Sequence, residues 1–456
     1  MLLLNLTKLI TLLSTYLYFY KMHNHESIYI ANLIISTIKN SENVFWKLSQ
    51  WITSRIEFQT RVKDNYLINN LKTFYEKCPA HEFNITKDII EKHFNKPINE
   101  IFIFLQEIPE ASGSIGQVHM GILKDGRKVA IKIKHPDIDN NIIYLCWILK
   151  YIVNIRFLLK KINFDIRGIE EYLMKQTDFR NEAENLRKLK EYYKNNEYII
   201  IPDVYGEDHD ILIMEYIEGE NIESFYNKCL KNNKKKDHWE IMIKLWMFIR
   251  ESILIHNFFH ADLHKGNWKI NGEKIVIYDL GIILDNPEHF NINYEIWKGF
   301  ECRSPNILAS VISNNLINND IDKNLFKNEL SQYLKEKMDI NSIDFYGDIR
   351  NLLDFLNEKK IILNFQTLTY LLAFNLASLN FRNFSFIEDN SKTYFEGHLD
   401  RLLIMKDRCI KYNNQKLLEQ IEKDEEFFIN ENKDILKNIM DKKNNFAYEY
   451  ESSDSE

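Results

Sequence analysis

The chain carries His-Ala-Asp-Leu-His-Lys-Gly-Asn at residues 260–267, and this stretch decides the fold we expect. An apolar run follows it and ends in Asp-Leu-Gly at residues 279–281. An Asp and an Asn five positions apart, followed by a strand that ends in Asp-x-Gly, are the layout of a phosphotransfer site. Asp262 can then face the attacking hydroxyl or water, while Asn267 and Asp279 can hold Mg²⁺ on the phosphates of a nucleotide. Any one of these motifs could arise by chance, whereas the ordered set favours a kinase-like site for ATP and Mg.

A lysine for the phosphates is expected on an upstream strand, and Val-Ala-Ile-Lys at residues 129–132 supplies Lys132. A run of small residues precedes that strand and would let backbone amides approach phosphate oxygens closely. Between the two, Asp125 and Gly126 predict a hairpin turn, since this pair tolerates positive φ. The loop residues expected to contact the nucleotide are Ala111, Ser112, Gly113, Ser114 and Gly116.

Two further segments complete the expected nucleotide site. Residues 165–193 are predicted to form one helix, because apolar side chains recur there at spacings of three and four. The apolar run at residues 211–214 leads into a polar segment that ends at Gly219, as the connection between two kinase lobes does. The backbone of this connection is expected to bind adenine through Glu215, Tyr216 and Ile217.

Together these features resemble the UbiB/ADCK family of atypical, protein-kinase-like proteins, from about Val44 to about Gly281. The matching segments are Ser114–His119, Val129–Lys132, Glu182–Asn185, Phe259–Asp262, His264, Gly266, Asn267 and Asp279–Gly281. The resemblance implies an α+β, two-lobed protein-kinase-like fold that binds ATP and Mg. It also implies that Glu182 holds Lys132, that the protein is tied to ubiquinone-like isoprenoid-lipid metabolism, and that it is membrane-associated. Aminoglycoside-type phosphotransferases share the His-x-Asp-x-x-x-x-Asn spacing, but the matches at residues 117–119 and 47–50 favour the UbiB/ADCK type.

Members of that family carry a Lys-x-Gly-Gln motif in an N-terminal helical extension that covers the acceptor side. The corresponding run here is Lys-Leu-Ser-Gln at residues 47–50, so the resemblance implies a regulatory role for Lys47 and Gln50. By pattern alone, an ordinary amphipathic helix with one exposed Lys is the preferred interpretation of this run. The chain departs from the family pattern at Ser49, Gln176, Leu263 and Lys265.

Composition limits the classes of function that fit. A length of 456 residues suits two lobes and an extension, since a domain takes roughly 150 residues. A net charge of −7 argues against a general nucleic-acid binder. The five cysteines include no Cys-x-x-Cys pair, so we expect no disulfide or metal framework and a reducing, intracellular compartment.

The chain is expected to divide into a series of segments that differ in composition. They are a hydrophobic N-terminal segment at 1–24, a helical extension at 25–104, a kinase-like N-lobe at 105–217, a helical C-lobe at 218–440 and an acidic disordered tail at 441–456. Strands in the C-lobe are expected only near residues 268–279. The apolar region at 142–159 contains charged residues and is interpreted as an N-lobe helix rather than a membrane span.

The first 20 residues contain a single charged side chain, Lys8. A membrane anchor, a signal peptide and a packed amphipathic helix are all compatible with this stretch. Scattered Asn, Thr and Ser residues and the lack of a small-residue cleavage site favour a helix that contacts a membrane or packs on the protein.

The acceptor of the phosphoryl group is harder to predict. No Ala-Pro-Glu follows Gly281 after a long activation segment, which ordinary protein kinases use to dock peptides. We therefore expect a lipid or small-molecule acceptor, or ATP hydrolysis coupled to lipid handling, with a membrane surface as a further partner. A Ser/Thr protein kinase and a non-catalytic ATP-binding scaffold are the alternatives.

Overall fold

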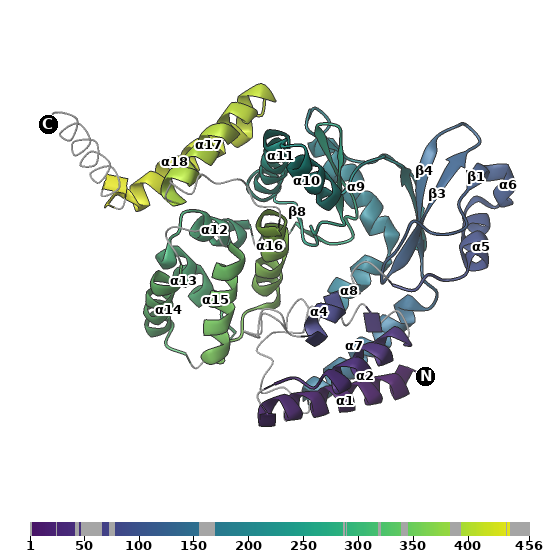
Figure 1. Ribbon diagram of the computed structural model, residues 1–456, viewed down its shortest axis with the longest axis horizontal. Coiled ribbons are helices and arrows are strands. Elements are labelled where there is room, and N and C mark those ends of the chain that lie inside the picture. The colour runs from purple at the N-terminus through teal and green to yellow at the C-terminus, as the bar shows by residue number, and fades with distance from the viewer. Residues whose placement is uncertain are drawn as a thin grey trace.

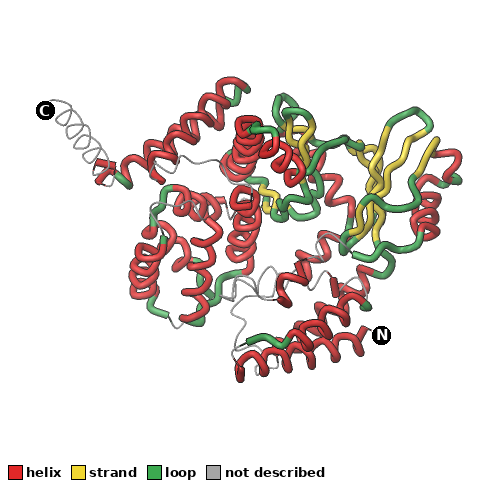
Figure 2. Tube along the Cα trace, in the orientation of Figure 1, coloured by secondary structure: helices red, strands yellow, loops and turns green. Residues whose placement is uncertain are grey.

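The computed structural model shows a sheet-rich lobe and a larger helical lobe, with a pair of helices at the N-terminus (Figures 1 and 2). This arrangement is the two-lobed, kinase-like α+β fold that the motifs predict. The structure describes residues 2–23, 25–41, 45–46, 66–72, 78–154, 169–285, 288, 290–317, 321–338, 345–383, 394–434 and 436–437. Lys47 and Gln50, the residues expected to regulate the site, lie outside the described residues.

The N-terminal helices α1 (Leu2–His23), α2 (Ile28–Lys39) and α4 (Tyr66–Lys72) are held together by one carboxylate. Glu26, in the connection between α1 and α2, accepts a hydrogen bond from the Tyr16 hydroxyl at 2.9 Å and from the Tyr66 amide at 2.6 Å. The helix α1 buries Leu6, Leu9 and Tyr16 and exposes its other side. Among the described residues, no helix is both long enough and apolar enough to cross a bilayer.

The sheet of the smaller lobe is antiparallel, in the order β1-β3-β4-β7-β6, with β2 paired to β3. Its strands are β1 (Phe102–Leu105), β2 (Ala111–Ser112), β3 (Gly116–Leu123), β4 (Lys128–Lys134), β6 (Val204–Asp208) and β7 (Ile211–Glu215). The predicted hairpin turn joins β3 to β4, and Gly126 there has a φ of +88°. One face of the sheet packs against α5 (Phe83–Phe94), beside which lies α6 (Ile98–Ile101).

Alternation along β4 separates the core of this lobe from the nucleotide side. Val129, Ile131 and Ile133 point to one face and form a buried cluster with Ile90 of α5. Lys132 lies on the opposite face, where it pairs with Glu182 and Asp279.

Between β4 and β6 the described chain forms the helices α7 (Ile138–Asn154), α8 (Ile169–Thr177) and α9 (Phe179–Tyr192). The prediction of a single helix over residues 165–193 is wrong, because the helix is interrupted at Asp178. Asp178 has extended backbone angles, and its carboxylate accepts a hydrogen bond from the Arg180 amide, which caps α9. A helix break made by a capping side chain leaves the apolar spacing on both sides intact, so periodicity did not reveal it.

The helical lobe is built around α11 (Lys235–Leu254), in which every residue from Ile241 to Leu254 is buried. The other helices are α10 (Ile222–Lys231), α12 (Phe290–Glu301), α13 (Pro305–Asn314), α14 (Lys323–Lys337), α15 (Phe345–Glu358), α16 (Phe365–Asn383), α17 (Tyr394–Lys411) and α18 (Gln415–Glu431). Figure 1 shows α17 and α18 at the edge of this lobe, away from the sheet.

Short strands carry the motifs of the helical lobe. β9 (Trp268–Asn271) and β10 (Lys274–Ile277) form a hairpin, and β5 (Ile199–Ile200) pairs with β10 in parallel. The two strands of the hairpin lie where the sequence predicted strands, near residues 268–279. A further pair, β8 (Phe259–His260) and β11 (Ile283–Leu284), lies outside the predicted strand region. Two-residue strands are too short to show an alternating pattern.

Candidate functional site

Lys132 is the centre of the candidate nucleotide site. Its Nζ atom lies 2.7 Å from Oε2 of Glu182, on α9, and 2.9 Å from Oδ1 of Asp279, which follows β10. The Lys132 side chain is 12% exposed and that of Glu182 only 2%. Of the two nearby acidic residues on α9, Glu182 is the buried one, whereas Glu184 is exposed. Three elements far apart in the sequence therefore converge on one ammonium group.

The charges in this cluster shift one another's pKa values. Burial alone would lower the pKa of Lys132, but the carboxylates of Asp279 and Glu182 hold it above its ordinary value. Burial would raise the pKa of Asp279, and the Lys132 ammonium overrides this and lowers it. Glu182 moves the other way, because its burial outweighs the attraction of Lys132 and raises its pKa. Asp279 is thus ionised at neutral pH, and its side chain is 42% exposed, so a cation can reach it.

The backbone around Asp279 is held in an unusual conformation. Asp279 has a φ of +58°, in the left-handed region that is uncommon for residues other than glycine. Asn185 of α9 donates from Nδ2 to the carbonyl oxygen of Leu280 at 2.8 Å, and His260 donates from Nε2 to that of Tyr278 at 3.3 Å. These two bonds hold the carbonyl groups of the residues before and after Asp279, whose carboxylate lies 2.9 Å from Lys132 Nζ.

Residues 260–267, which we call the catalytic stretch, fold back on themselves. The amide of Asp262 donates to Nδ1 of His260 at 3.2 Å, and Nδ2 of Asn267 donates to the carbonyl oxygen of Asp262 at 2.9 Å. This bond occupies the nitrogen of the Asn267 amide and leaves its oxygen as the atom that could bind a cation. His260 is buried and its pKa is lowered by burial, so it is a neutral support for the loop. Asp262 is 33% exposed and open to an incoming molecule.

A residue far along the chain also holds the catalytic stretch, and no sequence motif marked it. Asn380, buried on α16, donates from Nδ2 to the carbonyl oxygen of Leu263 at 2.9 Å and accepts from Nε1 of Trp268 at 3.1 Å. One side chain thus ties the middle and the end of the stretch between Asp262 and β9 to the helical lobe.

Replacing Asn380 with Leu is expected to loosen this stretch. Each buried polar group left without a partner costs about 1–3 kcal/mol, and we expect ATP turnover to fall about tenfold or more as Asp262 loses its position. Asn375 on the same helix is the control, because neither of its side-chain polar atoms has a hydrogen-bond partner in the described part of the chain. Denaturant unfolding and turnover should show Asn375→Leu to be neutral or stabilising, and an equally harmless Asn380→Leu would contradict this role.

The expected phosphate loop runs from Ala111 to Gly116, between β2 and β3. The amide of Gly113 donates to the carbonyl oxygen of Gly116 at 2.9 Å, which closes a tight turn. A Cβ atom at Gly116 would lie only 2.4 Å from the carbonyl oxygen of Ile133 on β4, so this position requires glycine. A Cβ at Gly113 would meet Gly116 O at 3.6 Å, an ordinary contact.

Alanine is therefore expected to destabilise the protein at Gly116 but to leave its stability nearly unchanged at Gly113. Gly116→Ala should cost about 1–3 kcal/mol, because the backbone of β4 must move to admit the methyl group. Gly113→Ala should change the free energy of unfolding by no more than about 0.5 kcal/mol. Chemical denaturation of the two variants measures both values, and equal costs would show that the loop does not pack on β4 as described.

One of the three residues expected to bind adenine has an available backbone donor. The amide of Glu215 donates to Asp203 O at 2.7 Å, and that of Tyr216 donates to Lys128 O at 3.1 Å. Ile217 follows them, and within the described residues its amide has no hydrogen-bond partner. Of the three residues expected to bind adenine, Ile217 is therefore the one whose N–H group is available for a base.

A group of mostly buried polar side chains lies behind the phosphate loop, and only two of them, Gln117 and His119, belong to a segment that the sequence analysis singled out. We call it the histidine network; its members are His81, Thr86, Gln117, His119 and His135. Burial, followed by the charges of the other two histidines, lowers the pKa of His81 to about 4. Burial also lowers the pKa values of His119 and His135. The imidazoles are neutral in the folded protein at neutral pH.

This network predicts how stability depends on pH. The unfolded chain takes up protons on these histidines near pH 6.5, whereas folded His81 does so only near pH 4. Acidification through this interval should lower the free energy of unfolding, with each such imidazole adding about 1.4 kcal/mol per pH unit to the slope. We expect His81→Leu to show a shallower slope than the wild type in denaturation between these pH values, and equal slopes would contradict a depressed pKa.

A charged cluster near the end of β4 does not indicate a metal site. Asp139, His209 and Asp210 are close enough together to share a cation. The ammonium of Lys134 already lies among them, 2.7 Å from Asp139 Oδ2 and 2.6 Å from Asp210 Oδ1. Lys134 is buried, so the cluster is an ion-pair network that fastens the end of β4 to α7 and to the turn between β6 and β7.

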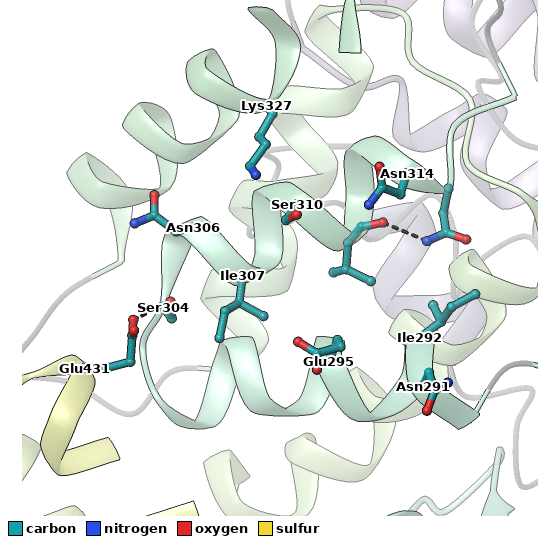
Figure 3. Close-up of a pocket in the computed structure, with 12 residues that line it drawn as sticks. Asn291, Ile292, Glu295, Ser304, Asn306, Ile307, Ser310, Asn314, Lys327 and Glu431 are labelled. Atoms are coloured by element: carbon teal, nitrogen blue, oxygen red, sulfur yellow. Dashed lines mark hydrogen bonds between the residues drawn. The ribbon is translucent and has the colours of Figure 1, made fainter. Parts of the chain in front are cut away.

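A cavity of about 590 Å³ lies in the helical lobe, lined by α12, α13, α14 and the end of α18 (Figure 3). Its lining is mostly polar, and Figure 3 shows Lys327 and Glu295 on opposite sides of it. No residue of the candidate nucleotide site lines this cavity. It is therefore separate from the cluster around Lys132.

The fold and the arrangement around Lys132 define a protein of the kinase-like class. The model of the ABC1 atypical kinase-like domain matches residues 73–300 of this chain, which confirms the resemblance stated from the motifs. The chain belongs to this family of UbiB/ADCK-type atypical kinases.

Curated relatives carry names of the same kind. The probable serine/threonine-protein kinase abkC of Dictyostelium discoideum is 31% identical over 250 residues, which cover 52% of this chain and 34% of that protein. The AarF domain-containing protein kinase 1 of Xenopus tropicalis is 29% identical over 240 residues, covering 50% of this chain and 45% of the relative. The chain thus spans less than half the length of these relatives.

A solved structure also aligns with much of this chain. The complex of Rv3197 with erythromycin, from Mycobacterium tuberculosis, aligns with a TM-score of 0.42 and 17% sequence identity. The alignment covers 69% of this chain and 85% of that one. The kinase-like character of the present chain rests on its own sheet order, motifs and family match.

Proposed function

We propose that this chain is an atypical kinase or ATPase that binds ATP with Mg²⁺ between its lobes and transfers or hydrolyses the γ-phosphoryl group. The observation that carries the proposal is the pair of contacts of Lys132, 2.7 Å from Glu182 and 2.9 Å from Asp279. A lysine held by a helix carboxylate beside an Asp-x-Gly aspartate is the arrangement that phosphoryl transfer in kinases requires.

Each residue has a role that follows from its position. Glu182 orients Lys132, whose ammonium neutralises the α- and β-phosphates. The Asn267 side-chain oxygen and the Asp279 carboxylate are the hard oxygen ligands that Mg²⁺ prefers, and the ion when bound supplies charge neutralisation at the phosphates. Asp262 orients or deprotonates the acceptor hydroxyl or a water.

The ion pair between Lys132 and Asp279 suggests that metal binding and nucleotide binding are coupled. Lys132 bridges two carboxylates, so Asp279 partly neutralises its positive charge. A divalent cation held by Asp279 would compete with that ion pair and free Lys132 for the phosphates. The protein would then bind nucleotide and metal together more tightly than either alone, which is a positive coupling between two ligands.

The acceptor we propose is a lipid or another small molecule of isoprenoid metabolism. Only residues 280–289 separate Asp279 from the first residue of α12, which leaves little chain for a peptide-docking segment. A protein acceptor is the second candidate, since the relative abkC is called a probable serine/threonine-protein kinase.

We further propose that the protein associates with a membrane surface through its N-terminal helices and α7. Large apolar side chains there face solvent, among them Leu4 at 72% exposure, Tyr29 at 74% and Trp147 at 62%. Figure 1 draws α7 in the same part of the molecule as α1 and α2. Tyr and Trp are enriched at membrane–water interfaces because one end is apolar and the other polar.

Turnover of ATP by the purified chain tests this proposal. Phosphate release should be measured with Mg²⁺, with and without lipid vesicles, across a panel of isoprenoid lipids and phenols. Stimulation by an isoprenoid lipid supports the proposed acceptor class. Phosphate on a generic protein substrate, lost in Asp262→Asn, would instead establish a protein kinase. Nucleotide binding without turnover under any condition would leave only a scaffold.

A further inference from the structure

The histidine network reaches the phosphate loop through one side chain, His135. This residue follows β4 directly, and it is buried. Its Nε2 atom lies 2.9 Å from the carbonyl oxygen of Gly113, and its backbone amide donates to the carbonyl oxygen of Ile115 at 2.9 Å. His135 therefore holds the loop at two points, once through the side chain and once through the backbone.

The partners of His135 determine where its hydrogen lies. A carbonyl oxygen only accepts, so Nε2 of His135 carries the hydrogen and donates to Gly113 O. In a neutral imidazole Nδ1 is then bare, and it accepts from Nδ1–H of His81 at 2.8 Å. His81 is fixed in turn by Thr86, whose hydroxyl lies 3.0 Å from His81 Nε2. The chain of bonds thus runs from α5 to the loop without a formal charge.

Two more carbonyl groups of the loop accept hydrogen bonds from backbone amides. Ser112 O accepts from the amide of Cys78 at 3.1 Å, and Gly116 O accepts from that of Gly113 at 2.9 Å. Carbonyl oxygens repel phosphate oxygens, whereas amide hydrogens attract them. A loop that binds phosphate must therefore keep its carbonyl groups away from the ligand's phosphates.

The geometry of the peptide bond links the His135 contact to the direction of the Ser114 amide. In a trans peptide, the C=O of one residue and the N–H of the next point in opposite directions. Drawing Gly113 O towards His135 therefore points the Ser114 N–H to the other side of the loop. His135 and its partner His81 contact α5 through Thr86, whereas Lys132 lies on the opposite face of β4. The Ser114 N–H therefore points away from His135 and the histidine network.

We propose that His135 is a positioning residue for nucleotide binding: its Nε2–H bond to Gly113 O orients the Ser114 amide towards the phosphates of the ligand. This inference rests on the proposed function, because a nucleotide phosphate is the ligand that the loop would meet. The side chain acts through the loop and does not touch the nucleotide itself.

A matched pair of substitutions tests the role. Glutamine places its amide nitrogen about where Nε2 of histidine lies, whereas asparagine places it about where Nδ1 lies. His135→Gln can keep the bond to Gly113 O, and His135→Asn cannot. By calorimetric titration with Mg–ADP, we expect His135→Asn to weaken binding about fivefold or more and His135→Gln to stay within about twofold of the wild type.

Hydrogen exchange separates this inference from the proposed function. In the nucleotide-free protein, the amides of residues 114–116 should exchange faster in His135→Asn than in His135→Gln. Equal exchange in the two variants, or unchanged Mg–ADP affinity in His135→Asn, would overturn the positioning role. If the wild type binds no nucleotide at all, the proposed function fails, while the exchange comparison still decides whether His135 orients the loop.

A second pair of variants keeps the inference testable if His135→Asn does not fold. His81→Asn retains an amide donor facing Nδ1 of His135, whereas His81→Leu removes it. We expect faster exchange of the loop amides and weaker Mg–ADP binding only in His81→Leu. Identical behaviour of these two variants would show that the network does not control the loop.

Discussion

Asp279→Asn is expected to reduce Mg-dependent ATP turnover by at least about a hundredfold, because preorganised charge at the phosphates is the main source of catalysis in such a site. The substitution keeps the size of the side chain but removes the charge that attracts the cation and that pairs with Lys132 at 2.9 Å. Since Glu182 still holds Lys132, we expect the protein to remain folded. Phosphate release under saturating ATP and Mg²⁺ measures the loss.

Asp285→Asn is the matched control for this prediction. Asp285 follows β11, lies close to Asp279 in the sequence, and pairs with Lys188 at 3.3 Å on the surface, where its side chain is 50% exposed. Removing its charge should leave turnover unchanged. Comparable turnover in Asp279→Asn and wild type would mean that Asp279 holds no catalytic cation.

Glu301→Ala is expected to destabilise the protein by about 3–5 kcal/mol, because it leaves a buried cation without a counter-charge. Arg250 of α11 and Glu301 of α12 form an ion pair in which the two side chains are 0% and 2% exposed. Burial raises the pKa of Glu301, and Arg250 opposes that rise. Denaturant unfolding at neutral pH measures the cost.

The double variant Arg250→Met/Glu301→Leu shows whether the loss of stability comes from losing the ion pair or from leaving a buried charge unpaired. Apolar residues of similar size commonly replace a buried ion pair without loss, so we expect the double variant to regain most of the stability. A surface pair gives the scale: Glu329→Ala breaks the exposed contact with Lys359 and should cost less than about 1 kcal/mol. A double variant as unstable as Glu301→Ala would contradict this account.

The parts of the site that could be predicted are those whose chemistry is written locally. Lys132, Asp262, Asn267 and Asp279 each lie in a short motif with a fixed spacing, and the structure brings Lys132 and Asp279 within 2.9 Å. The turn at Gly126 was predictable for the same reason, since positive φ restricts the residue types that fit. Motifs of this kind describe what the local backbone must do.

The parts that could not be predicted depend on contacts between distant segments. Asn380 meets the carbonyl oxygen of Leu263 across 117 positions of sequence, and nothing in the surrounding helix distinguishes it from Asn375. His81 and His135 are 54 positions apart and belong to no motif. The break at Asp178 was missed because a capping side chain ends one helix and starts another within a continuous apolar pattern.

The central claim is that the cluster around Lys132 is the Mg–nucleotide site of the protein. Calorimetric titration of ATP into the purified wild type and Lys132→Met, each with Mg²⁺ and with a chelator, tests it most directly. We predict binding of one nucleotide per chain that weakens on metal removal and is lost in Lys132→Met. Absence of binding to the wild type, or binding indifferent to both Lys132 and Mg²⁺, would contradict the claim.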